Sequence, residues 1–581
     1  MSISLSILLF QMTCAYHLKH VIFGIFPGNS LFTFDMSVRQ EQAFLRVWIF
    51  RMVSFETKEN THKEGGIMYS TVLSGALLGV QAAMVLVEVD ATSGLPSINM
   101  VGSLSGEVRE SKERVLAALK NAGIDIPPKH VTINLSPADL RKEGTAYDLP
   151  IAVGMLQALG FFQKANAEEI LFLGELGLNG EIRTVRGVLP IVREAVARGV
   201  KECIVPLENA REGAMIPGIK VRGAKELEQV MCFLLAEGKE REKILPVVTV
   251  SASELLQEKD PFTGNDFAEV RGQEVAKRAA KIAAAGFHNL LMIGPPGAGK
   301  SMIAKRIPGI MPPLSLEESL EVTTIYSVAG LLGNRALITD RPFQSPHHTI
   351  SLPALTGGGT LPRPGIISLS HRGVLFLDEL PEFQRNSLDG MRQPLEDKKI
   401  QITRVGGNLT YPADFMLVCA MNPCPCGYFP NRNKCRCTEP QIKHYAGRVS
   451  GPILDRIDLC VELHAVEVTN LHGGYLGETS AQIQKQVEQV RQIQAERFAG
   501  TNYRFNGDVQ AADMERFCPL GEAQKNCMER LYEEMGLSAR SYHRICKVAR
   551  TIADLAGEER IRTEHLLEAA MFRPAQEIWK M

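Results

Sequence analysis

The 581-residue chain lacks long apolar runs, an excess of charge of either sign and a dense set of cysteines. Without an apolar run of about 18 or more residues, the sequence predicts no membrane-spanning helix. Lys and Arg number 64 and Asp and Glu 65, a net charge of -1, which excludes a polybasic nucleic-acid coat. Twelve cysteines are too sparse for a disulfide scaffold, so we expect a reducing cytoplasm. At roughly 150 residues per domain, the length predicts three or four domains.

The first 67 residues differ in composition from the rest of the chain. Residues 5–10 are apolar, but no Lys or Arg precedes them and no small-residue cleavage pattern is obvious, which disfavours a targeting signal. The run Lys63-Glu64-Gly65-Gly66 can be encoded by a purine-rich ribosome-binding sequence just before Met68. We therefore expect residues 1–67 to be a non-native extension that results from a misplaced start.

Residues 68–236 alternate between strand and helix patterns. Strands are predicted at 80–89, 131–135, 171–176 and 203–206, a hairpin turn at Asn179-Gly180, and helices at 106–122, 148–159 and 188–198. The pattern predicts an α+β domain. Residues 237–266 open with a charge run and continue as a polar segment, so we expect a solvated linker there.

The central third of the chain contains a phosphate-binding motif. An apolar strand at residues 289–293 leads into Gly-x-x-x-x-Gly-Lys-Ser, and a helix follows. In such a loop the backbone N–H groups surround the phosphates, the Lys reaches the β and γ phosphates and the Ser reaches Mg²⁺. The predicted nucleotide-binding residues are Gly294, Pro295, Pro296, Gly297, Ala298, Gly299, Lys300 and Ser301.

Two acids end a second buried strand at residues 374–377. The carboxyl ends of parallel strands are where open α/β sheets bind ligands. Asp378 is predicted to hold Mg²⁺ through water, and Glu379 to polarise the attacking water. Asn422, at the end of a third apolar strand, is a candidate to orient that water, and Arg456 is a candidate arginine finger that completes a neighbouring site.

These motifs, at residues 294–301, 373–383, 421–427 and 450–458, give the chain from Met68 onward a close resemblance to the YifB/ComM family of magnesium-chelatase-like AAA+ ATPases. The resemblance implies a multidomain α/β protein with a P-loop AAA+ αβα core at 267–475. A helical lid, or magnesium-chelatase-related C-terminal domain, is implied at 476–581. In that lid Arg540 fits the second-sensor arginine that touches the γ-phosphate, with Arg544 as the alternative.

The α+β domain resembles the Lon-protease-like domain, which has a ribosomal-S5-domain-2-type fold. The Ser-Lys dyad of Lon-type proteases does not carry over. Asp148-Leu149-Pro150-Ile151 replaces Asp-Gly-Pro-Ser, and the helix that should present the Lys offers Leu189, Val192 and Arg193. Hydrophobic side chains cannot act as nucleophile or base, so a non-catalytic domain is expected.

Two inserts match this AAA+ clade. Residues 341–372 match its helix-2 insert and contain Pro346-His347-His348; adjacent histidines on a strand point apart, so a loop role is favoured over metal binding. Residues 398–411 are predicted to form a hairpin around Gly406-Gly407-Asn408, which matches the pre-sensor hairpin that lines the ring pore in helicase relatives. Its basic residues Lys398, Lys399 and Arg404 are candidate DNA contacts, and a solvated hairpin tip is the equal alternative.

Four cysteines lie within fourteen residues: Cys424, Cys426, Cys435 and Cys437. Four thiolates suit tetrahedral zinc, which would tie a loop too short for a core of its own. The C-x-C spacing is tighter than the usual C-x-x-C, so a reduced loop without metal stays an equal alternative. The hydrolytic metal must be Mg²⁺ on oxygen ligands.

The sequence thus predicts an ATP- and Mg²⁺-dependent AAA+ motor that self-associates into a ring, a hexamer by resemblance. DNA remodelling of the branch-migration or helicase type, in natural transformation or recombination, is implied by the family rather than by the residues. Two alternatives stay open: a protein-remodelling motor of Lon or chaperone type, and an ATP-dependent regulatory switch with little turnover.

Overall fold

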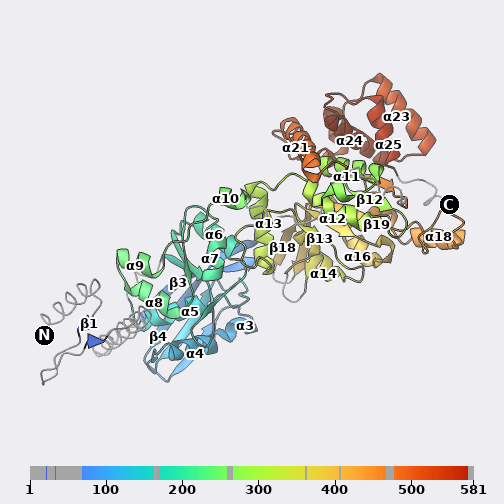
Figure 1. The fold of residues 1–581 in the computed structure, drawn as a ribbon. Helices are drawn as coiled ribbons and strands as arrows, with labels where there is room; N and C mark the ends of the chain where they lie inside the picture. Colours follow the sequence, from blue (N-terminus) through green and yellow to red (C-terminus); the bar gives the residue numbers. More distant parts are fainter. Residues whose placement is uncertain are drawn as a thin grey trace, which may run out of the picture.

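The computed structural model describes residues 68–162, 167, 169–257, 266–359, 363–404, 407–465 and 477–573, and a short strand pair, β1 Val21–Ile22 and β2 Thr33–Phe34. The extension predicted over residues 1–67 otherwise lies outside the described residues. Figure 1 shows a blue-to-green N-terminal unit beside a green-to-red C-terminal unit, with helices α21 to α25 at the top of the view.

The N-terminal unit is built on a seven-stranded mixed sheet of order β11-β10-β7-β3-β4-β6-β5. Strands β3, β4 and β6 pair antiparallel, whereas β10 runs parallel to both of its neighbours. The strands are β3 Met68–Leu78, β4 Gln81–Thr92, β5 Ser97–Val101, β6 His130–Ser136, β7 Ile170–Phe172, β10 Glu202–Pro206 and β11 Lys220–Ala224.

Helices cover both faces of this sheet. Strand β4 alternates, so Val85, Val87 and Val89 face one core while Met84 packs in the other. The first core contains α4 Ser111–Asn121, α5 Asp148–Ala158 and α8 Leu227–Leu235. The second contains α6 Val188–Ala197 and α7 Leu207–Gly213.

Most predicted elements of this unit are present, with two interruptions. The helix predicted at 106–122 is two helices, α3 Gly106–Arg109 and α4, and Ser105 caps the first by accepting from the Val108 N–H at 3.4 Å. The strand predicted at 171–176 stops after β7, because Glu175 and Leu176 form β8, which pairs with β9 Ile182–Arg183. That pairing is the hairpin predicted at Asn179-Gly180.

The charge run predicted to begin a solvated linker is exposed at six of its seven residues, as predicted, but it is helical. It forms α9 Lys239–Ile244, whose Glu242 binds the buried guanidinium of Arg222 at 2.8 Å. Arg222 also binds Glu202, so two carboxylates compensate its burial. Val248 and α10 Ala252–Gln257 pack on the second core. The chain therefore stays attached to the first unit up to Gln257.

The C-terminal unit contains a five-stranded parallel sheet of order β13-β16-β19-β12-β20. Leu290 and Met292 of the interior strand β12 face one core, and Leu291 and Ile293 face the other. Helices α11 Glu274–Gly286 and α12 Lys300–Ile310 lie on the first side, and α18 Glu439–Ala446 lies on the second. The strands are β12 Leu290–Ile293, β13 Phe343–Gln344, β16 Val374–Leu377, β19 Met416–Met421 and β20 Leu459–Glu462.

Inserted segments extend from this sheet. The predicted hairpin is present as β17 Lys399–Arg404 paired with β18 Gly407–Pro412. The insert before β16 comprises α14 Leu352–Thr356, the strand pair β14 Gly357–Gly358 and β15 Arg363–Pro364, and α15 Ile366–Leu369. Directly after β16 in the chain come η3 Leu380–Glu382, α16 Arg385–Gly390 and α17 Arg392–Asp397.

A helical layer closes the unit. It contains α21 Ser480–Arg497, α22 Met514–Phe517, α23 Glu522–Met535, α24 Ala539–Leu555 and α25 Thr563–Met571. Its apolar side chains share one core with α11 and α12, which is why the lid sits directly over the sheet. Within the described ranges, no helix combines the length and apolar character needed to cross a membrane.

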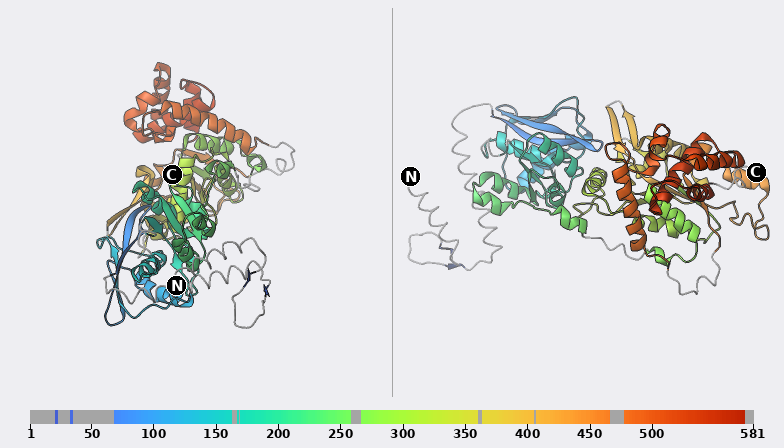
Figure 2. Two further views of the ribbon diagram at one scale, coloured as in Figure 1. Left: turned by 90° about the vertical axis from the view of Figure 1, so that its left-hand side faces the viewer. Right: turned by 90° about the horizontal axis from the view of Figure 1, so that it is seen from above.

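The two units are joined by packing as well as by the chain. Ser327 of α13 Leu316–Ala329 hydrogen-bonds the buried carboxylate of Glu212 in α7. The Ser327 carbonyl accepts from the Gly187 N–H at 3.1 Å. The tight turn between β3 and β4 also reaches the hairpin: a Cβ on Gly79 would lie 3.5 Å from the Thr410 carbonyl. In Figure 2, seen from above, the blue strands lie beside the yellow hairpin.

Candidate nucleotide site and cysteine cluster

The phosphate loop leaves the carboxyl end of β12 and ends where α12 begins. Gly297 and Gly299 have φ values of 77° and 94°, a left-handed backbone that glycine adopts without strain. Lys300 is buried, and its Nζ donates to the carbonyl oxygens of Gly294 at 2.6 Å and Pro295 at 3.0 Å. Burial lowers the pKa of Lys300, and the nearby Asp378 opposes that shift. These carbonyl oxygens carry no net charge, so an anionic phosphate is a stronger partner for the Lys300 ammonium than they are.

The predicted magnesium residues meet at one point. Ser301 Oγ donates to Asp378 Oδ2 at 2.7 Å, and Asp378 Oδ1 accepts from the Glu379 N–H at 2.9 Å. A hydroxyl and a carboxylate are hard oxygen ligands of the kind that Mg²⁺ prefers. The donor set therefore fits Mg²⁺ bound with a nucleotide.

Glu379 has an unusual backbone. Its φ of 53° is left-handed, which is uncommon for a residue other than glycine and marks a conformation held by its surroundings. Its side chain is 59% exposed, and Oε2 lies 3.2 Å from Nδ1 of His348 in the insert. The sequence placed the two histidines in a loop but gave no sign of this contact, because they precede Glu379 by about thirty positions.

Asn422 lies at the end of β19, between the phosphate loop and the acids. Strand β19 pairs with both β12 and β16, and Asn422 Oδ1 accepts from Lys300 Nζ at 3.1 Å. The side chains of Lys300, Ser301, Asp378 and Asn422 thus converge as the order of the motifs predicted.

The candidate arginines lie at the amino-terminal end of the parallel strands, opposite the carboxyl end from which the phosphate loop leaves. The Arg456 carbonyl accepts from Asn289 Nδ2 at 2.8 Å, and Asn289 immediately precedes β12. The Arg456 guanidinium binds Glu396 and donates to the Pro452 carbonyl at 2.6 Å. At ~3.3 Å per residue, β12 alone separates this edge from the phosphate loop by about 10 Å.

The lid arginines occupy the same edge as Arg456. Arg540 is exposed and lies 3.6 Å from Asp455, whereas Arg544 is buried and lies 3.8 Å from Asp458. Burial lowers the pKa of Arg544, and Asp458 opposes that shift. These positions do not place Arg540 beside the phosphate loop of its own chain.

The four clustered cysteines form a compact group. Their sulfurs all lie within 4.8 Å of one another, with Cys424 Sγ 3.8 Å from Cys435 Sγ and Cys426 Sγ 3.6 Å from Cys435 Sγ. Tetrahedral zinc with bonds of about 2.3 Å requires sulfurs about 3.8 Å apart. The donor set therefore fits a tetrahedral metal site.

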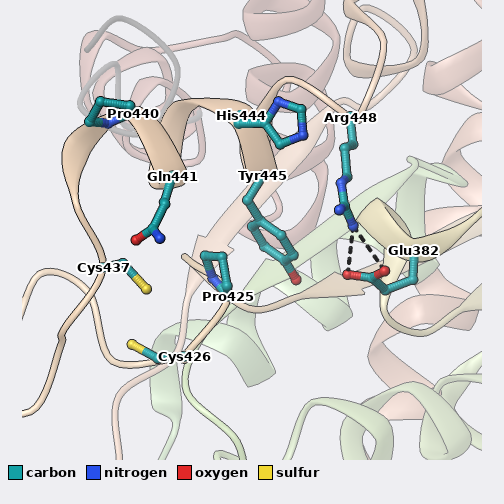
Figure 3. A pocket seen from close by; sticks show the side chains of 9 residues that line it. All are labelled: Glu382, Pro425, Cys426, Cys437, Pro440, Gln441, His444, Tyr445 and Arg448. Carbon is teal, nitrogen blue, oxygen red and sulfur yellow. Dashed lines mark hydrogen bonds and ion pairs between the residues drawn. The ribbon is translucent and has the colours of Figure 1, made fainter.

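The cysteine loop touches the phosphate loop. A Cβ on Gly427 would lie 2.5 Å from Pro296 Cδ, so glycine is required where the two loops cross. Beside the cluster is a cavity of about 730 Å³, into which Cys426, Tyr445 and Arg448 project. Figure 3 shows the Cys426 and Cys437 side chains facing one another on one side of this cavity. The Arg448–Glu382 ion pair, at 2.9 Å, lies on the other side.

The basic residues of the hairpin are not equivalent. Lys398 precedes β17 and binds Asp508, and its Nζ lies 3.2 Å from Asp414. Burial lowers the pKa of Lys398, but the two carboxylates outweigh it and raise that pKa overall. Lys398 thus anchors the base of the hairpin to the lid and core, and its role as a DNA contact stays a prediction. Lys399 is exposed, and the Arg404 side chain lies outside the described residues.

The Lon-like domain contains no Ser-Lys dyad at residues 148–151 and 189–193. Asp148 is fully buried and accepts from Arg114 Nε at 2.7 Å and from the Leu176 N–H at 3.1 Å. Ile151, Leu189 and Val192 are buried in the domain cores. Asp148 therefore has a structural role as the partner of Arg114.

A phosphate loop after an interior strand of a parallel sheet, acids two strands away, a polar residue between them and a helical lid define a P-loop nucleoside triphosphatase of the AAA+ class. Residues 266–471 match the family described as magnesium chelatase, subunit ChlI, and residues 477–573 match its C-terminal family. Residues 87–209 match the family described as subunit ChlI of Mg-chelatase.

The chain belongs to the ComM/YifB family of magnesium-chelatase-like proteins. It is 42% identical to competence protein ComM of Haemophilus influenzae over 503 residues, which cover 86% of this chain and 97% of that protein. It is also 42% identical to YifB of Escherichia coli over 505 residues, 87% of this chain and 97% of that protein. Lon protease 2 of Bacillus subtilis is 26% identical over 172 residues, 28% of this chain and 31% of the protease.

Proposed function

We propose that the chain is an ATP-hydrolysing ring motor that remodels DNA. The observation that carries the ATPase part is the convergence of Lys300, Ser301 and Asp378 around one point at the sheet edge. Lys300 binds the phosphates, Ser301 and Asp378 hold Mg²⁺, and Glu379 polarises the attacking water while Asn422 orients it. Bound Mg²⁺ neutralises charge that develops on the phosphates.

Self-association follows from the position of the arginines. Arg456 and Arg540 lie at the edge of the sheet opposite their own phosphate loop. They therefore act on the nucleotide of a neighbouring subunit, where a guanidinium stabilises the transferring phosphoryl group. When each subunit completes the nucleotide site of the next subunit, the subunits can form a closed ring, and we propose that this ring is a hexamer.

DNA is the proposed substrate because the hairpin carries basic residues and contains none of the residues assigned to the nucleotide site. Lys399 is exposed, and Arg404 is at the hairpin end. Contacts of this kind meet backbone phosphates rather than base edges. The relative ComM is named a competence protein, and we extend a role in the handling of incoming DNA to this chain.

The cysteine cluster is proposed to hold a structural Zn²⁺. A tetrahedral zinc with four thiolates has no open position, so its role is mechanical. Gly427 packs closely against Pro296, and the cysteine loop begins just after Asn422. The metal would therefore fix Asn422 against the phosphate loop. A reducing cytoplasm keeps these thiols available. The Lon-like domain is proposed to be non-catalytic and not a protease.

The test is steady-state ATP hydrolysis with and without single-stranded, duplex and forked DNA. We expect basal hydrolysis that forked DNA raises severalfold. Hydrolysis that no DNA stimulates would favour a protein-remodelling motor. Binding of ATP with almost no turnover under every condition would favour a regulatory switch.

A further inference from the structure

The segment that carries Arg456 is hydrogen-bonded to the residue just before β12. Asn289 Nδ2 donates to the Arg456 carbonyl at 2.8 Å, and Asn289 Oδ1 accepts from the Leu417 N–H at 2.8 Å. The Asn289 side chain therefore links the arginine to β19, the strand that leads to Asn422. We propose that Asn289 is a positioning residue that holds Arg456 where it can reach the nucleotide of the neighbouring subunit. This role rests on the proposed action of Arg456 on a neighbour.

The backbone of Asn289 holds the same segment independently of its side chain. Its carbonyl accepts from the N–H groups of Asp458 and Leu459, both at 3.0 Å, and its N–H donates to Asp458 Oδ2 at 3.1 Å. These three bonds involve only the peptide groups of Asn289, so they remain when its side chain is replaced. The side-chain amide adds the bond to Arg456 itself. Replacement of the side chain therefore loosens the arginine but keeps β12 paired with β20.

The bond from Asn289 differs from the contacts that the Arg456 guanidinium makes. The guanidinium binds Glu396, whose side chain is 58% exposed, and donates to the Pro452 carbonyl at 2.6 Å. Its Nε is buried and has no hydrogen-bond partner among the described residues. A phosphate of a neighbouring subunit's nucleotide can replace these contacts, because it is charged and offers several acceptor oxygens. The bond from Asn289 holds the backbone, so it persists when the guanidinium turns.

The placement of this guanidinium matters for rate more than for binding. An arginine of this kind acts on charge that develops in the transition state, so a small displacement lowers kcat. Asn289 lies at the amino-terminal end of β12, and at ~3.3 Å per residue that strand separates it by about 10 Å from the phosphate loop of its own chain. Loss of its side-chain contacts should therefore leave ATP binding by the same chain intact.

The direct test is basal ATP hydrolysis by the full chain, without DNA, for Asn289→Ala and Asn289→Asp. The Asp variant keeps an acceptor for the Leu417 N–H but places a carboxylate oxygen against the Arg456 carbonyl, where the amide donated. We expect both variants to lower kcat on the order of tenfold with KM for ATP unchanged, as for the loss of one hydrogen bond. Thr551→Val is the matched control: it removes the hydroxyl 2.8 Å from Nε2 of the adjacent His288 and should leave kcat unchanged.

Mixed assemblies show on which side of the interface Asn289 acts. Asn289→Ala mixed with Glu379→Gln should exceed the weighted mean of the two activities, because the Glu379→Gln subunits supply a correctly placed Arg456 to subunits that retain Glu379. Asn289→Ala mixed with Arg456→Ala should stay at the mean, since neither protein then has a correctly placed arginine. A merely structural defect in the nucleotide site of the Asn289 variant gives the reverse pattern.

The outcomes also separate the role of Asn289 from the proposed function. Recovery with Arg456→Ala instead of Glu379→Gln, an unchanged kcat in both Asn289 variants, or an equal fall in Thr551→Val overturns the positioning role and leaves the proposed ATPase intact. If Arg456→Ala keeps full kcat, or is not rescued by Glu379→Gln in co-assembled mixtures, action on a neighbour fails and the positioning role fails with it. A protein that no DNA stimulates would refute the DNA function alone, because all of these rates are measured without DNA.

Discussion

Ser301 Oγ donates a hydrogen bond to Asp378 Oδ2 across 2.7 Å. The two residues follow strands that are not adjacent, since β19 lies between β12 and β16. The parallel order of the sheet brings their carboxyl ends to one edge, where the hydroxyl and the carboxylate provide the proposed magnesium site.

Binding and hydrolysis of ATP should separate by mutation. Glu379→Gln should still bind ATP with Mg²⁺ but lose turnover by at least about 100-fold, because the loop and the metal ligands remain while the water is no longer polarised. Lys300→Ala should weaken ATP binding itself by roughly tenfold or more. Equilibrium binding of a fluorescent ATP analogue and steady-state hydrolysis measure the two effects. Ordinary turnover by Glu379→Gln would refute the role assigned to that residue.

Arg456 should act across the interface between subunits. Arg456→Ala and Glu379→Gln should each be inactive alone, yet their mixture should recover part of the activity, because some sites then combine an intact Glu379 with an intact neighbouring Arg456. The matched control is a mixture of Lys300→Ala with Glu379→Gln, which should recover nothing since both residues serve the same chain. Absence of rescue in mixtures that demonstrably co-assemble argues against action on a neighbour.

Lys399 and Arg404 should carry the salt-dependent part of DNA binding. Replacement of both with Ala should lower DNA affinity and reduce the log–log salt slope by about 0.7 to 0.9 for each DNA phosphate that is no longer neutralised. Basal hydrolysis should change little, because the hairpin lies off the nucleotide. Lys398→Ala is the contrasting variant: it breaks the ion pairs with Asp414 and Asp508 and should lower the melting temperature. A salt slope that the double variant leaves intact would move the DNA site elsewhere.

The cysteine cluster should bind about one zinc per chain, detected by elemental analysis of protein purified without added metal. Cys424→Ser should remove most of this zinc and reduce ATP binding, because the loop no longer supports Pro296 and Asn422. Cys232→Ser, in α8 of the N-terminal unit, is the control and should retain the metal. Full zinc content in Cys424→Ser would exclude the proposed coordination.

The sequence predicted the parts of the site that strand-end motifs encode. An apolar strand followed by a fixed polar pattern identifies Lys300, Ser301 and Asp378, and the parallel order then brings them together. The hairpin at 398–411 was predicted from its turn residues, and the structure confirms it.

Pairings between segments far apart in sequence were not predictable in this way. Lys398 resembles any other hairpin cation until the fold brings Asp508 to it from the lid. His348 is an ordinary loop residue until the insert folds back to Glu379. The charge run at 237–243 is exposed as predicted, but its pairing through Glu242 was not predictable, because the partner, Arg222, is a buried residue on an edge strand. No local pattern encodes such pairings.

The measurement that tests the proposed function most directly is strand displacement from a fluorescently labelled forked DNA with ATP and Mg²⁺. We predict displacement by the wild-type protein that requires hydrolysable ATP and is absent in Glu379→Gln. A protein that hydrolyses ATP in the same reaction but displaces no strand from forked, branched or partially duplex DNA would contradict a DNA-remodelling motor.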